Sequence, residues 1–348
     1  MTDGGTTADG EGGGTPLAGA SRPTWVLGAD SGGSGLRITL AALTEGGAPQ
    51  AVGTVTSAEP VRTGAQGIDA EHMLAQLVPA ARDLLARAGE QAQDAGLDAV
   101  CVGAAGMATL GGQLRAQLPG ALTHEFGARR IALAADAVTA YAGALGQLPG
   151  AVVAGGTGLI AMGTDLHSWR RADGWGHLLG DCGSGAWIGQ AGLQAAMRAY
   201  DGREGGSAAL RERAEAVFGA PLSGLPAHLY PRTDRPAVLA SFAPEVAACA
   251  EHDVVAEEIL LAAAQEIATA AAAVCPAEEG AAVAVTGGLF RIGEPLLGPL
   301  REQLDRRTPQ AHLTDPAGDP LDGALLIAAR LSSGALHLPQ DAGLLSLT

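Results

Sequence analysis

The chain has 348 residues, of which 47% are hydrophobic and 3% aromatic, and it carries a formal net charge of −16. This length allows one or two domains with sizeable cores, and the 52 glycines favour a globular α/β protein built from small residues. The negative charge argues against a nucleic-acid partner, and no apolar run is long enough to cross a membrane, so we expect neither partner.

Cysteine usage and the N-terminal segment favour a cytoplasmic protein. The four cysteines are scattered and form no Cys-x-x-Cys pair, which disfavours a disulfide framework and a zinc site. Residues 1–21 lack the basic and apolar regions of a signal peptide. Because this segment is rich in Gly, Thr and Asp, we expect residues 1–22 to form a disordered tail.

Two residue types are missing from the chain. It contains no lysine and no asparagine, so all 21 basic residues are arginines. Without lysine there is no Walker A loop and no Schiff-base chemistry. Any phosphate site must therefore use backbone N–H groups, arginine or a metal ion.

In chain order, the first half predicts a hairpin around a glycine-rich turn and then alternating helices and strands. The expected elements are strands 25–27, 38–43 and 51–56, a helix 69–89 with Asp69 as its N-cap, a strand 99–104, a short helix 110–118 and a strand 130–135.

The second half repeats this order of elements. The expected elements are strands 151–154 and 159–163 around a second glycine turn, a helix 184–203, a long Ala-rich helical stretch 238–274 broken near Pro244, a strand 281–286, a helix 294–307, a strand 312–314 and a helix 322–331. Because the pattern appears twice, we expect two similar α/β domains with a cleft between them.

Three glycine-rich turns, at 30–37, 155–158 and 286–289, each follow an apolar run. A strand that ends in glycines presents backbone N–H groups that can hold phosphate. Asp136 closes another buried strand between the first two turns. Together these features predict a cleft that transfers phosphate.

Three charged residues near these turns have a functional and a structural interpretation. Asp30 suits the role of a magnesium-binding carboxylate, or of an ordinary turn residue before glycine. Arg37 could reach a phosphate or face solvent from its strand. Asp136 could take the proton of an attacking hydroxyl, or cap the helix that follows it, and these two roles are compatible.

The densest polar stretch spans residues 170–187 and holds two tryptophans, one histidine and two aspartates. An aromatic ring beside carboxylates and glycine backbone suits a polyhydroxylated sugar ring. The structural alternatives are an N-cap role for Asp181 and an ordinary core or surface position for His177.

These motifs resemble those of the sugar kinase, Hsp70 and actin superfamily. Asp30-x-Gly-Gly-Ser-x-x-Arg37 is similar to its first phosphate motif, Ala154-Gly-Gly-Thr-Gly158 to its second, and Thr286-Gly-Gly-Leu289 to its adenosine motif. The block Gly174-Trp-Gly-His-Leu-Leu-Gly-Asp181 resembles the N-acetylglucosamine kinase and BadF/BadG ATPase-like family most specifically. The match runs over about residues 24–332.

The resemblance implies two similar actin-like (ribonuclease H-like) α/β domains and a role for each group of residues. Asp136 would be the catalytic base, and Asp30 would hold Mg²⁺. The ATP contacts would come from the glycine turns, through Gly32, Gly33, Ser34, Arg37, Gly155, Gly156, Thr157, Gly158, Gly287 and Gly288. The sugar contacts would be Ala105, Gly106, Gly174, Trp175, Gly176, His177 and Asp181. The expected division is an N-terminal domain over 23–136, a C-terminal domain over 137–320 and a final helix over 321–336 that returns to the first domain.

Two departures from the family pattern bear on the substrate. Cys182 stands where the family usually has Glu, and the stretch 57–67 carries Glu59 and Arg62 in place of the family's Asn. Both sites read the substituent at C2 of the sugar in that family. A free, cationic amine suits an acidic, lysine-free cleft better than an acetamide does. We therefore expect an ATP- and Mg²⁺-dependent kinase that acts on the 6-hydroxyl of glucosamine.

Three alternatives remain open at this point. N-acetylglucosamine or another hexose could be the substrate. An ATPase that activates a radical dehydratase would need a cysteine-held iron–sulfur cluster between subunits, which the scattered cysteines argue against. A non-catalytic nucleotide- or sugar-sensing switch would usually carry a DNA-binding domain, for which the acidic tail is too short. The sequence also leaves a homodimer open.

Overall fold

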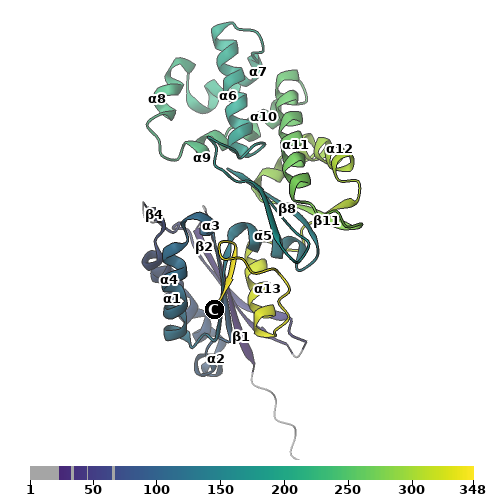
Figure 1. Ribbon diagram of the computed structural model, residues 1–348. Helices are drawn as coiled ribbons and strands as arrows, with labels where there is room; N and C mark the ends of the chain where they lie inside the picture. Colours follow the sequence, from purple (N-terminus) through teal and green to yellow (C-terminus); the bar gives the residue numbers. More distant parts are fainter. Residues whose placement is uncertain (1–22, 33–34, 45, 65–66) are drawn as a thin grey trace, which may run out of the picture.

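The computed structural model describes residues 23–32, 35–44, 46–64 and 67–348, and these residues form two main β-sheets with helices around them (Figure 1). Each sheet has its own hydrophobic core, so the molecule has two bodies, a lower and an upper one in Figure 1. The predicted site residues Gly33 and Ser34 and the predicted disordered tail over residues 1–22 lie outside the described residues. Within the described part, none of the helices combines the length and apolarity needed to cross a bilayer.

The lower body is built on a six-stranded sheet with the strand order β13-β7-β6-β1-β2-β3. β1 pairs in parallel with β6, and β6 with β7, while β1, β2 and β3 form an antiparallel meander. α1 and α4 cover one face and α13 the other (Figure 1). The elements are β1 (Thr24–Gly32), β2 (Gly35–Leu43), β3 (Pro49–Ser57), β4 (Thr63–Gly64), β5 (Gly67–Ile68), α1 (Ala70–Ala88), α2 (Glu90–Ala95), β6 (Ala99–Ala104), α3 (Met107–Leu110), α4 (Gly112–Phe126), β7 (Arg130–Ala135), α13 (Pro320–Ser332) and β13 (Leu345–Leu347).

The upper body is built on a five-stranded sheet with the order β10-β9-β8-β11-β12. β8, β9 and β10 are antiparallel, and β11 is parallel to both β8 and β12. α11 packs on one face of this sheet and α5 on the other. The elements are α5 (Asp136–Leu145), β8 (Gly150–Gly155), β9 (Leu159–Thr164), β10 (Trp169–Asp173), α6 (Gly185–Asp201), α7 (Ala208–Phe218), η1 (Leu222–Gly224), α8 (Leu225–Leu229), α9 (Arg235–Ala240), α10 (Ala243–Cys249), α11 (Val254–Val274), β11 (Ala281–Thr286), η2 (Gly288–Ile292), α12 (Glu294–Arg307) and β12 (Ala311–Thr314).

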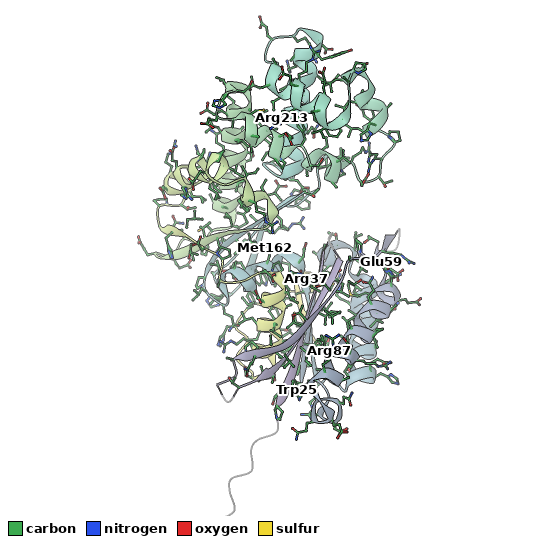
Figure 2. All side chains as sticks on the ribbon, turned by 180° about the vertical axis from the view of Figure 1, so that it is seen from behind. Trp25, Arg37, Glu59, Arg87, Met162 and Arg213 are labelled. Carbon is green, nitrogen blue, oxygen red and sulfur yellow. The ribbon has the colours of Figure 1, made fainter. Side chains whose placement is uncertain are left out.

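Two helices join the bodies. α5 packs on the upper sheet, α13 packs on the lower sheet, and α5 and α13 pack against each other. They approach so closely that a Cβ atom on Gly323 would lie 1.9 Å from the carbonyl oxygen of Thr139, and one on Gly143 would lie 2.0 Å from that of Asp319. Glycine at both positions is therefore a requirement of the crossing. Met162 of β9 accordingly contributes to the core of the lower body (Figure 2).

Local patterns predicted most elements well. The strands at 99–104 and 130–135 and the helix at 294–307 have the expected bounds. Asp69 caps α1, because its side chain accepts the N–H of His72. The first hairpin strands are longer than predicted, since β1 runs through Asp30 to Gly32.

Other predictions were wrong in detail. The helical stretch 238–274 is three helices, α9, α10 and α11, and the residues between them turn the chain. Asp136 is the first residue of α5 and its N-cap is Ala135, while Ser184 rather than Asp181 caps α6. The last helix ends at Ser332, and the chain after it returns as β13, which pairs with β7. The proposed domain boundaries stay a prediction.

Candidate active site

A cavity of about 910 Å³ lies where the two bodies meet. Ten of the predicted site residues line it: Gly106, Asp136, Gly155, Gly156, Thr157, Gly158, Gly174, Asp181, Gly287 and Gly288. Residues from both sheets therefore meet in one space, as a two-substrate site requires. Seven other predicted residues in the described part are not among its lining residues: Asp30, Gly32, Arg37, Ala105, Trp175, Gly176 and His177.

Asp136 lies at the junction of β7 and α5 and is one of the residues that line this cavity. The pKa of Asp136 is raised to about 6, mainly by burial. The charge of Asp30 also raises this pKa, whereas the N–H of Ala137 (2.9 Å to Oδ1) and the charge of Arg171 lower it. A carboxylate with this pKa is ionised at neutral pH and still basic enough to accept a proton. That is the property expected of a general base.

The second and third glycine turns lie side by side in the cavity wall. Gly287 has φ +103°, and a Cβ atom there would lie 2.2 Å from the carbonyl oxygen of Gly155. The first turn of α6 supports the second glycine turn, since Gly185 N–H donates to Gly156 O (2.9 Å) and Ala186 N–H to Thr157 O (3.1 Å). Glycine backbone in close contact leaves an open surface that a phosphate chain could occupy.

The loop after β10 is held by Asp173 and Arg171. The carboxylate of Asp173 accepts the N–H groups of Asp181 (2.6 Å) and Cys182 (2.8 Å). Arg171 donates to the carbonyl oxygens of Asp173 (3.1 Å) and Gly174 (2.6 Å), and its guanidinium lies 4.4 Å from the ring centroid of Trp175. These contacts fix the backbone that presents the predicted sugar-binding residues.

Asp181 is turned toward the second glycine turn. Its Oδ1 accepts the N–H of Gly176 (3.2 Å), and its Oδ2 lies 2.7 Å from where a Cβ atom on Gly158 would be. Burial raises the pKa of the Asp181 carboxyl. Trp175, the neighbour of the lining residue Gly174, is 62% exposed, so its ring is accessible for stacking.

Arg37 lies between two carboxylates, which the sequence did not predict. Its Nη2 donates to Asp30 Oδ2 (2.7 Å) and its Nη1 to Asp319 Oδ2 (2.5 Å). The side chain is therefore not the solvent-facing strand charge that the sequence offered as one interpretation, and its contact with a phosphate stays a prediction. Burial raises the pKa of Asp30, against the effect of Arg37, and the ion pair with Arg37 holds the pKa of Asp319 below its usual value although burial opposes this.

The acidic residues near the cavity suit Mg²⁺, which takes one or two carboxylates together with water and substrate phosphates. Asp30 is 9% exposed and close enough to Asp136 to affect its pKa. No group of three or more His, Cys, Asp or Glu residues in the described ranges could hold a metal ion by itself.

Sequence reasoning gave no individual role to four residues, Arg171, Asp173, Arg291 and Asp319, although the polar stretch 170–187 contains the first two. Arg171 and Arg291 line the cavity, and Arg291 follows the third glycine turn in η2. Because the chain has no lysine, a phosphate site must use arginine, backbone N–H groups or a metal ion. The arginines next to the glycine motifs could therefore have been predicted as phosphate-site residues. Glu59 and Arg62 lie outside the cavity lining, and Glu59 contacts His72 (3.1 Å) and Arg62 (3.6 Å).

Comparisons with known proteins agree with this architecture. The solved structure named "Putative N-acetylglucosamine Kinase from Chromobacterium violaceum" is 30% identical, with a TM-score of 0.62, over 87% of this chain and 98% of that chain. A protein of the same description from Porphyromonas gingivalis shares the fold at 17% identity, with a TM-score of 0.64 over 89% and 99% of the two chains.

A curated relative matches a shorter segment. The N-acetylmuramic acid/N-acetylglucosamine kinase of Clostridium acetobutylicum is 39% identical over 75 residues, which is 21% of this chain and 24% of that protein, so the match spans about a quarter of the relative. The model of the BadF/BadG/BcrA/BcrD ATPase family matches residues 27–328. The expected actin-like α/β fold and the family resemblance are thereby confirmed, and the chain belongs to the BadF/BadG/BcrA/BcrD ATPase family.

Proposed function

We propose that this protein is an ATP-dependent kinase that transfers phosphate to the 6-hydroxyl of an amino sugar, with D-glucosamine as the preferred acceptor. The observation that carries the proposal is Asp136. Asp136 lines a cavity that two glycine turns also line, and burial raises its pKa to about 6. A base and a phosphate-binding backbone in one space are the parts that phosphoryl transfer to a hydroxyl needs.

In the proposed reaction, ATP lies along the glycine turns, with Arg291 available to its phosphates. The sugar lies against residues 174–176, near Asp181. The oxygen of the 6-hydroxyl attacks the γ-phosphorus as the bond from that phosphorus to the β-γ bridging oxygen breaks, and Asp136 accepts the hydroxyl proton. ADP and the sugar 6-phosphate are the products.

Magnesium, when bound, would neutralise charge on the transferring phosphoryl group, and Asp30 is the residue proposed to hold it, directly or through water. Movement of the two bodies about α5 and α13 would exclude water from the closed site. We infer no other cofactor.

The preference for glucosamine rests on charge. The chain has no Asn to hold an acetamide, and Asp181 and Asp173 place carboxylates at the proposed sugar loop. A charge-assisted hydrogen bond from an ammonium group to a carboxylate contributes about 1.5–3 kcal/mol. At 1.36 kcal/mol per tenfold, this corresponds to about 10- to 150-fold in kcat/KM.

N-acetylglucosamine is the second candidate, because the relatives that match this chain are described as N-acetylglucosamine kinases. Glu59 pairs with His72 and Arg62. Any contact between Glu59 and the C2 substituent would therefore form only when the sugar is bound.

A coupled ADP-release assay over a panel of sugars tests the proposal, followed by steady-state kinetics with glucosamine and N-acetylglucosamine at saturating ATP and Mg²⁺. We expect the higher kcat/KM for glucosamine and a phosphate on oxygen 6 of the product by NMR. An equal or higher kcat/KM for N-acetylglucosamine would overturn the preference for glucosamine but leave the proposed kinase activity standing. No sugar-dependent ADP release with any sugar would reject the kinase itself.

A further inference from the structure

Arg37 and Asp30 are directly opposed on the antiparallel strands β1 and β2. The guanidinium of Arg37 uses two different nitrogens for two different carboxylates, Nη2 for Asp30 and Nη1 for Asp319. Its side chain is only 30% exposed, and that of Asp30 only 12%. The planar guanidinium of Arg37 therefore links two carboxylates through separate charge-assisted hydrogen bonds.

The two oxygens of Asp319 have separate tasks. Oδ1 accepts the N–H groups of Leu321 (2.7 Å) and Asp322 (3.1 Å), which makes Asp319 the N-cap of α13. Oδ2 accepts from Arg37. In return, Asp322 Oδ2 accepts the N–H of Asp319 (2.9 Å), so this helix end is a complete capping box.

Asp319 also lies where the chain passes from one body to the other. β12 belongs to the upper sheet, and α13, which begins at Pro320, packs on the lower one (Figure 1). The crossing segment is fixed to α5 by Ala317 N–H, which donates to Ala144 O (3.0 Å), and by the close approach of Gly143. α5 in turn begins at Asp136.

We propose that Arg37 and Asp319 are a positioning pair: their ion pair holds the Asp30 carboxylate at a fixed place relative to the chain crossing and the helix that carries Asp136. Figure 2 shows Arg37 at the end of the lower sheet that faces the upper body. This inference rests on the proposed function, because the quantity that the pair controls is productive binding of nucleotide. Arg37 itself is a positioning residue and not a phosphate ligand.

Asp319→Asn is the sharpest variant, because Asn is a good N-cap and keeps an oxygen at the Oδ1 position while the negative partner of Arg37 is removed. Asp322→Asn is its matched control, since it also removes one negative charge from the same capping box, where the Asp322 carboxylate accepts the N–H of Asp319 and the carboxylate that pairs with Arg37 is kept. Arg37→Met removes the guanidinium, and Arg37→Lys keeps the charge but cannot donate in a planar fork to two carboxylates.

The experiment measures kcat/KM for ATP, KM for the sugar, calorimetric binding of MgADP and the melting temperature for these variants and for the double variant Arg37→Met/Asp319→Asn. We expect Asp319→Asn to lower kcat/KM for ATP by about tenfold and Arg37→Met by about 100-fold, with MgADP binding weakened in the same order. Arg37→Lys should recover part of the loss. Asp322→Asn should stay within about twofold of the wild type, and KM for the sugar should be unchanged throughout.

The double variant decides the mechanism. If Asp319 acts through Arg37, the double variant equals Arg37→Met and the two losses do not add. Losses that add, or a response of Asp319→Asn that equals that of Asp322→Asn, overturn the pair. If the wild-type protein binds no MgADP, the proposed function is overturned. If the wild type binds MgADP and every variant binds it equally tightly, only the positioning pair is overturned.

Discussion

Arg171 of β10 and Asp136 of α5 line the same cavity, and the charge of Arg171 opposes part of the effect that burial has on the Asp136 carboxyl. Burial alone favours the neutral acid, while the cation and the N–H of Ala137 favour the carboxylate. The resulting pKa of about 6 keeps Asp136 ionised at neutral pH. An ordinary surface aspartate would be a weaker base by about two pKa units.

The pH dependence of activity follows from this value. Asp136 must be deprotonated to accept a proton, so kcat/KM should rise about tenfold per pH unit below pH 6 and level off above it. The measurement is kcat/KM for the sugar between pH 4.5 and 8.5 in buffers of constant ionic strength. An acidic limb centred near the pKa of an exposed aspartate would contradict the assignment.

Asp136→Asn should lower kcat by about 100-fold or more while nucleotide binding stays near normal, because the amide cannot take the hydroxyl proton.

The same variant should be more stable at pH 7.5. The folded-state pKa of about 6 lies above the ordinary aspartate pKa of 3.8, so ionising Asp136 destabilises the folded protein progressively as pH rises between these values. The gain is up to about 3 kcal/mol by the 1.36 kcal/mol per pKa unit rule.

Urea unfolding of the wild type and Asp136→Asn at pH 4 and pH 7.5 measures this gain. It should be present at the higher pH and shrink toward zero at the lower one. Wild-type turnover in a folded Asp136→Asn protein would reject the role of base, and an equal stability difference at both pH values would reject the linkage.

Arg171→Met should move the acidic limb of kcat/KM to higher pH, because loss of the nearby cation raises the pKa of Asp136. It should also raise KM for the sugar, since the carbonyl oxygens of Asp173 and Gly174 lose their donor. Arg171→Lys should keep the acidic limb near the pH at which the wild type shows it, but KM for the sugar should still rise. Arg170→Met, at the exposed neighbouring position of β10, is the control and should change neither quantity.

Gly323→Ala should destabilise the protein by more than about 2 kcal/mol, because its Cβ atom would lie 1.9 Å from the backbone oxygen of Thr139. Gly120→Ala is the matched control within a helix. Outside the adjoining backbone of its own helix, no atom lies within 4 Å of the added Cβ at Gly120, and the change should stabilise the protein by up to about 1 kcal/mol. Chemical unfolding compares the two, and similar responses would show that the α5–α13 crossing tolerates a side chain.

Chelation should abolish activity and reductant should not. Asp30 and the substrate phosphates would share Mg²⁺, so excess EDTA should stop turnover and added Mg²⁺ should restore it. All four cysteines are free thiols, and dithiothreitol should leave the rate unchanged. Full activity in EDTA, or loss of activity with reductant alone, would contradict one half of this expectation.

The sequence by itself determined the local elements and the motifs. Strands such as 99–104 and 130–135 were predictable because a fully buried strand is a short apolar run, and the glycine turns because backbone that must stay open needs residues without side chains. Asp136 could be singled out because it is a lone carboxylate at the end of a short apolar run. The resemblance to the family then followed from motif order.

Only the tertiary structure decided the contacts between distant residues. Arg37 and Asp319 are 282 positions apart, and nothing local indicates that the first hairpin meets the cap of the last helix. Arg171 and Arg291 likewise reach the cavity only because two sheets meet there, and the pKa of Asp136 depends on how deeply the assembled bodies bury it. Periodicity encodes which face of an element is buried, but ion pairs and desolvation depend on what is packed against that face, which the order of residues along the chain does not specify.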